Sequence, residues 1–157
     1  MNKNVFNPQD AQSAKNATLF VTIGKRRYAM LNAKDFEAKA TVSTADVPRL
    51  GCMIMGKKPT GLEIKLSMTV YKCSDMFDDI IESYKETGIL PVFDCQVTSE
   101  DGTTNIGKST KVYKDCIIDG EVLLSMFDAA GEFIEQSIEA YAMDYSTSDK
   151  YTEPSYM

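Results

Sequence analysis

The sequence contains no histidine among its 157 residues and no long run of apolar residues. The missing histidine removes the commonest general base and the commonest metal ligand, so we expect no metal, no cofactor and no catalysis. No stretch approaches the roughly 20 apolar residues that span a bilayer as a helix, and the N-terminus lacks a secretory hydrophobic segment. We therefore expect a soluble protein that is made in a cytoplasm.

Cysteines are few and widely spaced. The four cysteines are each more than 20 residues from the next, at Cys52, Cys73, Cys95 and Cys116. This spacing fits neither a zinc site nor a C-x-x-C redox motif. Because free cysteine is among the most buried residue types, we predict four buried free thiols.

The charges are divided unevenly along a chain whose length predicts one domain. Residues 1–60 carry ten Lys/Arg and four Asp/Glu, whereas residues 61–157 carry seven and nineteen, within a total of −6. Opposite patches of this kind can attract copies of the same chain head to tail. The alternative is that each charged region only solvates its own face of the protein.

One long strand with a period of two dominates the middle of the sequence. From Leu62 to Tyr71 apolar and polar residues alternate, which predicts a strand whose apolar face carries Leu62, Ile64, Leu66, Met68 and Val70. Similar patterns predict further strands over residues 18–23, 28–31, 36–43, 91–98, 108–118 and 121–127. Residues 132–145 fit a helix or a strand, and we favour a strand.

A single amphipathic helix is expected over residues 75–87. Ser74 or Asp75 can cap it, and Gly88 can end it in a left-handed conformation. Its apolar stripe consists of Met76, Phe77, Ile80, Ile81 and Tyr84.

The remaining segments are polar or rich in turn residues. We expect residues 1–17 to form an N-terminal arm, residues 18–148 one β-rich domain, and residues 149–157 a loose C-terminal tail. Residues 44–61 contain three glycines and two prolines and are expected to form one long loop.

Residues 102–109 match the letters of a phosphate-binding P-loop, G-x-x-x-x-G-K-S. A P-loop must open into a helix whose amides hold the phosphates, but the residues after Ser109 favour a strand. We therefore interpret this match as coincidence. A P-loop nucleotide-binding protein using Lys108 and Ser109 remains a minor alternative, which predicts a helix after Ser109.

Several pieces of the sequence, in their order, resemble the tail tube proteins of contractile phage tails, including those of defective-prophage particles and R-type bacteriocins. The resemblance runs from about Gly24 to Asp144. It rests on residues 24–29 (GKRRYA), 47–51 (VPRLG), 55–61 (MGKKPTG), 66–71 (LSMTVY), 84–88 (YKETG) and 99–102 (SEDG) together with Gly107.

The resemblance implies a mostly β fold with one α-helix (α+β), an antiparallel β-sandwich or half-barrel. Six copies would form a ring whose long strands close one continuous barrel, and rings would stack into a tube for DNA or effector passage. The sheath would lie outside this tube, the tape measure inside it and the baseplate at one end. The protein would then belong to a virion or phage-tail-like particle, assembled in the bacterial host cytoplasm.

Within this arrangement we expect residues 44–61 to form an inter-subunit loop, with Lys57 and Lys58 meeting acidic groups of a neighbour. The candidate interface residues are Arg26, Arg27, Arg49, Gly51, Gly56, Lys57, Lys58, Pro59, Thr60 and Gly61. We also expect a net acidic channel that lets DNA pass without specific binding. A monomeric tail adaptor or completion protein is the other alternative.

Overall fold

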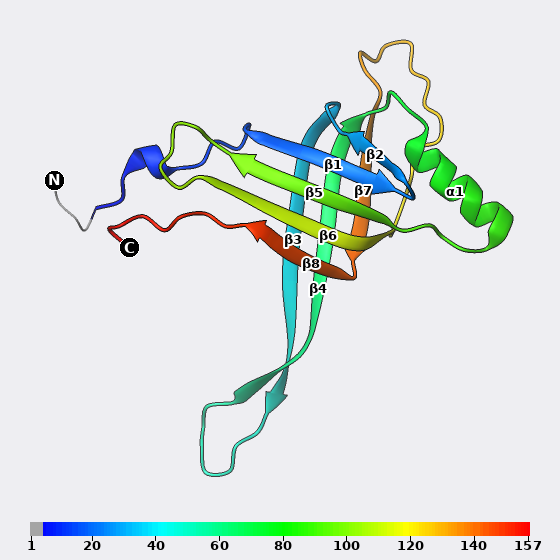
Figure 1. The fold of residues 1–157 in the computed structure, drawn as a ribbon. Coiled ribbons are helices and arrows are strands. Elements are labelled where there is room, and N and C mark those ends of the chain that lie inside the picture. The colour runs from blue at the N-terminus through cyan, green and yellow to red at the C-terminus, as the bar shows by residue number, and fades with distance from the viewer. Residues whose placement is uncertain (1–4) are drawn as a thin grey trace.

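The computed structural model describes residues 5–157 and consists mainly of strands (Figure 1). One α-helix, α1 (Met76–Thr87), and one short 3-10 helix, η1 (Pro8–Asp10), accompany them. The strands are β1 (Ala17–Ile23), β2 (Arg26–Ala29), β3 (Ala33–Val47), β4 (Gly56–Tyr71), β5 (Phe93–Glu100), β6 (Lys108–Ile118), β7 (Glu135–Ala142) and β8 (Asp144–Asp149). The predicted mostly β fold with one helix is confirmed.

All strand pairs are antiparallel, in the order β2-β1-β5-β6-β7-β4-β3, with β8 also paired to β6. Strand β6 joins the two halves of this open sheet. Most of β6 pairs with β5 and β8, whereas its last two residues, Ile117 and Ile118, pair with β7. As a result β3, β4 and β7 cross the other strands as a second layer (Figure 1).

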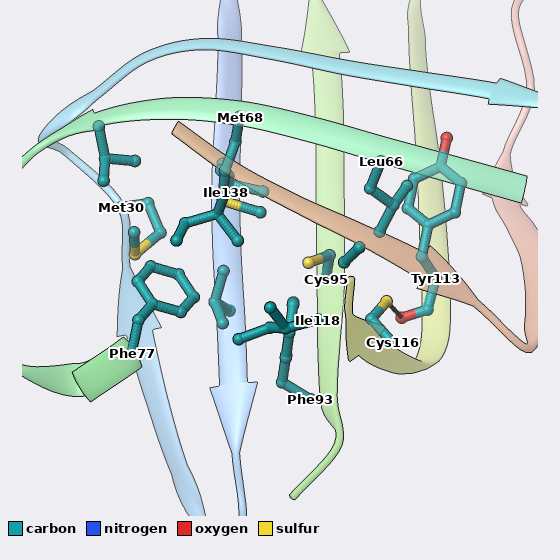
Figure 2. Close-up of a cluster of buried hydrophobic side chains, with 14 of the residues drawn as sticks. Met30, Leu66, Met68, Phe77, Phe93, Cys95, Tyr113, Cys116, Ile118 and Ile138 are labelled. Carbon is teal, nitrogen blue, oxygen red and sulfur yellow. Dashed lines mark hydrogen bonds between the residues drawn. The ribbon is translucent and has the colours of Figure 1, made fainter. Parts of the chain in front are cut away.

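The core fills the space between the two layers, and β4 contributes most to it. Ile64, Leu66, Met68 and Val70 are buried, as the alternation predicted. Figure 2 shows Leu66 and Met68 turned toward side chains of β5 and β6, with Ile138 of the neighbouring strand β7 beside Met68. Burying one such side chain stabilises a fold by roughly 1.5–3 kcal/mol, so this face of β4 anchors the second layer.

Helix α1 closes one end of the core. Met76, Phe77 and Ile80 are buried, and the Phe77 ring meets Phe93 edge to face at 6.1 Å between centroids. Tyr84, which we placed on the same stripe, is half exposed. Gly88 ends the helix at φ 75° and donates its N–H to the carbonyl of Tyr84, as predicted.

All four cysteines are free, but only two of them are buried. Cys95 and Cys116 lie in the core, whereas Cys52 and Cys73 are exposed, so the predicted burial is wrong for this second pair. The neighbouring Cys116 and burial in the core raise the pKa of the Cys95 thiol. Both effects keep Cys95 protonated.

The expected loop over residues 44–61 is mostly strand. β3 extends to Val47 and β4 begins at Gly56, which leaves only residues 48–55 as a loop. Pro59 fits inside β4 because a register shift lies beside it, between the pairs Ser43↔Gly61 and Thr44↔Pro59. Among residues 5–157 no third strand pairs with β4 at this point, and proline is tolerated at bulges and sheet edges.

The predicted strand over residues 121–127 is absent. The end of β6, where a hairpin partner would pair, is occupied by β7, and residues 119–134 form a long loop instead. The strand that we favoured over residues 132–145 is confirmed by β7. The predictions for β1, β5, β6 and α1 agree with the structure to within two residues at most ends.

Lys72, directly after β4, fastens the loop of residues 119–134 to the helix. Its ammonium donates to both carboxylate oxygens of Asp78, at 2.9 and 3.0 Å, and to the carbonyl of Leu123 at 2.6 Å. The side chains of Lys72 and Asp78 are only 12% and 19% exposed. Such shielding from water makes the loss of one partner costly.

We predict that Lys72→Met lowers the free energy of unfolding by about 2–4 kcal/mol, because it leaves the shielded Asp78 carboxylate without its partner. Urea unfolding at low protein concentration measures this change. The exposed pair Lys34–Glu135 supplies the control, and Lys34→Met should cost less than about 1 kcal/mol. Equal effects of the two substitutions would contradict the assignment.

Candidate subunit interface

Strands β3 and β4 run beyond the core as a two-stranded ribbon. β7 pairs with β4 only as far as Ile64, opposite Ala142, whereas β3 and β4 remain paired out to Val47 and Gly56. Figure 1 shows this ribbon projecting away from the rest of the protein. The apolar stripe of β4 continues into it, so that Leu62 and its partner Val42 are 59% and 60% exposed.

The ribbon ends in a loop, residues 48–55, which we call the ribbon tip. Arg49 organises it: its Nε and Nη2 donate to the carbonyl of Ile54 at 3.3 and 3.0 Å, and Nη2 lies 3.3 Å from the Cys52 sulfur. Gly51 adopts φ 74°, and a Cβ on Gly56 would lie 3.2 Å from the carbonyl oxygen of Val47. These residues shape the ribbon tip from within.

The ribbon tip carries apolar side chains that its own chain does not cover. Leu50 and Met53 are fully exposed, and Ile54 and Met55 are more than half exposed. A two-stranded ribbon is marginally stable when isolated in water, and an exposed apolar cluster adds no stability to it. This combination is typical of a surface that another polypeptide covers.

The predicted basic residues of the ribbon have different surroundings. Lys57 forms an exposed ion pair with Asp46 across the ribbon, within its own chain. Lys58 is exposed, and no ion pair involves it among residues 5–157. Thr60 donates to the carbonyl of Ser43 at 3.2 Å, and Gly61 pairs with Ser43.

Arg26 and Arg27 do not belong to this ribbon. They lie on β2, at the other end of the strand order. The Arg26 guanidinium covers the Tyr28 ring at 4.6 Å, and that of Arg27 covers Phe20 at 4.1 Å. The structure therefore divides the ten candidate residues between two separate places.

A second apolar surface, which sequence reasoning missed, lies on residues 119–134, here called the end loop. Its exposed side chains include Phe127, 95% exposed, and Leu124, Met126 and Phe133. Phe133 meets the Tyr71 ring edge to face at 6.2 Å, at the end of β4. The apolar run from Val122 to Phe127 was the available signal, but we assigned it to a strand.

The P-loop-like residues 102–109 adopt no phosphate-binding geometry. Strand β6 begins at Lys108, where a P-loop would open into a helix, so our interpretation of the match as coincidence is confirmed. Ser109 pairs with Ser99 in the sheet, and Lys108 lies 3.9 Å from the Asp149 carboxylate. The minor alternative of a P-loop protein is thereby removed.

Asp101 closes that loop and holds the N-terminal arm. Its carboxylate accepts from the Thr103 hydroxyl at 2.6 Å and from the amides of Thr103 and Ser13, both at 3.0 Å. The hydrogen bonds from Thr103, and then that from Ser13, lower the pKa of Asp101 because they stabilise its charged form.

A hollow of about 880 Å³ lies between the N-terminal and C-terminal segments. The Tyr156 hydroxyl donates to Oδ2 of Asp10 at 2.8 Å, whereas Oδ1 of Asp10 is buried without a hydrogen-bond partner. Residues 5–157 contain no cluster of three side chains suited to a metal and no helix long and apolar enough to span a membrane.

We predict that Arg49→Met loosens the ribbon tip without changing global stability. The variant loses the hydrogen bonds to Ile54, while surface substitutions typically change the unfolding free energy by less than about 0.5 kcal/mol. Thermolysin, which cuts beside large apolar residues, should therefore cleave the ribbon tip severalfold faster. Arg26→Met, on β2, should leave this cleavage rate unchanged; an unchanged rate in Arg49→Met would show that Arg49 does not organise the tip.

A second prediction concerns how acid affects the contact between Asp101 and the N-terminal arm. Because the folded-state pKa of Asp101 is lowered, its stabilisation of the arm is complete above the ordinary carboxyl pKa of about 3.9. This stabilisation is lost as the pH falls through the lowered pKa that Asp101 has in the folded protein. Asp101→Asn should expose the Ser13 amide to faster hydrogen exchange already at neutral pH, whereas Glu100→Gln should not. Full protection of Ser13 in Asp101→Asn would contradict this role.

Two solved structures share the fold. A chain in the six-fold symmetrised baseplate of the anti-feeding prophage (AFP) matches with a TM-score of 0.60 and 8% identity, covering 91% of this chain and 97% of the other. A chain in the extended sheath–tube complex of PVC, an extracellular contractile injection system, matches with a TM-score of 0.60 and 13% identity over 83% and 87%.

Sequence relatives extend this likeness beyond the fold. The phage-like element PBSX protein XkdM of Bacillus subtilis (strain 168) is 25% identical over 145 residues, which cover 92% of this chain and 95% of XkdM. The phage tail tube protein family matches residues 4–149, nearly the whole chain. The chain therefore belongs to the phage tail tube protein family, and it is a structural protein of the tail and not an enzyme.

Proposed function

We propose that this chain forms six-membered rings that stack into the inner tube of a contractile tail. The ribbon of β3 and β4 is the observation that carries the proposal, because it extends paired strands and an apolar tip beyond the core. Family membership supports a tube, and the six-fold symmetry of the AFP baseplate supports six copies.

Ring closure would use the free edge of β3. β3 is 15 residues long and, in the part of the chain that the structure describes, pairs only with β4. Its other edge therefore presents unpaired backbone donors and acceptors, which favour addition of a strand from another chain. Joining β3 to the second layer of a neighbour would continue the sheet around the ring into a barrel.

The channel would be lined by the face of β3, β4 and β7 that points away from the core. This face is polar, as the alternation predicts, and its carboxylates outnumber its ammonium groups. The carboxylates are Asp35, Glu37, Glu63, Glu135 and Glu139, and the ammonium groups are Lys34, Lys39 and Lys65. A net acidic wall would repel DNA phosphates, so DNA or an effector would pass without specific binding.

The other surfaces would face the remaining parts of the particle. The PVC neighbour comes from a complex of sheath and tube, which supports a sheath outside this tube. The AFP neighbour comes from a baseplate structure, which supports a baseplate at one end. A tape measure would occupy the channel before DNA or an effector passes. The chain would assemble in the bacterial cytoplasm and reside in a virion or phage-tail-like particle.

Negative-stain electron microscopy of the concentrated protein tests this function. We expect hollow tubes or six-fold rings with a stain-filled centre, because the free β3 edge and the apolar tip both gain partners on assembly. The core variant Leu66→Asp, which cannot bury its new charge, should form neither. Solid fibrils, or monomers at every concentration and with baseplate present, would contradict the tube and favour the monomeric adaptor.

A further inference from the structure

The ribbon tip and the end loop lie at opposite ends of the same strand. β4 leaves the ribbon tip at Gly56 and ends beside the end loop, where the Lys72 amide donates to the carbonyl of Ile134 at 2.9 Å. At roughly 3.3 Å per residue, the 16 residues of β4 span on the order of 50 Å. One copy therefore cannot cover its own end loop with its own ribbon tip.

The two surfaces match in apolar character. The ribbon tip exposes Leu50, Met53, Ile54 and Met55, and the end loop exposes Leu124, Met126, Phe127 and Phe133. Phenylalanine and methionine are both enriched at protein interfaces. Contact between the two surfaces would remove both apolar clusters from water at once.

The two surfaces also carry opposite charge. The end loop contains no lysine or arginine. It contains four carboxylates, those of Asp119, Glu121, Asp128 and Glu132. Around the ribbon tip, Arg49, Lys57 and Lys58 outweigh Asp46. Two ribbon tips would therefore repel each other, as would two end loops, whereas a ribbon tip and an end loop attract.

Both surfaces are held in place before any contact forms. Arg49 ties the ribbon tip through the carbonyl of Ile54. Lys72 holds the end loop at two points, through the carbonyls of Leu123 and Ile134. Within the end loop, Asp128 accepts from the amide of Ala130 at 3.0 Å. Such preorganisation lowers the entropy lost on binding.

We propose that the ribbon tip of one copy docks on the end loop of a second copy of this chain. The contact is heterologous, because it joins two different surfaces, and it therefore propagates from copy to copy. This inference rests on the proposed tube and specifies its axial contact: each ring is joined to the next by ribbon tips meeting end loops.

Two variants with one damaged surface each test the proposal. The tip variant carries Met53→Ser, Lys57→Glu and Lys58→Glu; the loop variant carries Glu121→Lys, Phe127→Ser and Glu132→Lys. Ile89→Ser, which alters an exposed apolar residue outside both surfaces, is the matched control. Circular dichroism confirms that each variant is folded, and sedimentation and electron microscopy measure assembly.

We expect each damaged variant alone to stop at single rings, or to need at least about tenfold more protein to form tubes. Mixing separately prepared rings of the two variants restores one intact contact, so paired rings should appear, but not long tubes. Ile89→Ser should form tubes like the unaltered protein.

The outcomes separate this inference from the proposed tube. If the unaltered protein forms neither rings nor tubes, the proposed function itself fails. If it forms tubes and either damaged variant forms them equally well, the tube stands and the docking of tip on loop is overturned. An absence of paired rings in the mixture would also overturn it, since each mixture still holds one intact tip and one intact loop.

Discussion

The burial of one face of β4 is the interaction on which the rest of this structure depends. Four consecutive inward side chains, from Ile64 to Val70, hold the second layer of strands against the first. Without them β3 would lose its only partner among the described residues, and the ribbon would have no base. The same strand leaves the core as the ribbon, so a single element both builds the domain and carries its projecting surface.

The sequence predicted those parts of the fold in which a local pattern agrees with the tertiary contacts. The alternation in β4 and the stripe and terminal glycine of α1 are of this kind. Turn-forming residues misled us over residues 44–61, because Gly61 and Pro59 suggested a loop while strand pairing with β3 prevailed. The register of this pairing depends on both strands together, so neither strand's sequence alone predicts it.

In the end loop the prediction failed in the opposite direction, because a strand was predicted where the structure has a loop. Its apolar run from Val122 to Phe127 has the composition of a strand, but β7 takes the place beside the end of β6. Lys72 then holds the run in an irregular conformation, with Phe127 in solvent. A residue 51 positions away along the chain makes this contact, and no spacing rule predicts it. The interface residues proposed from the sequence accordingly include the ribbon tip but not the end loop.

The antiparallel pairing of β3 with β4 also restricts how the length of the ribbon can change. Side chains alternate faces with a period of two, so inserting a single residue into β4 would turn the polar face inward unless a bulge absorbed it. The pairing of β3 with β4 requires a matching insertion in the other strand. Where no bulge absorbs the change, the distance from the core to the ribbon tip therefore changes in steps of about 7 Å, two residues in each strand. If the ribbon sets a repeat distance in an assembly, that distance would change by the same increments.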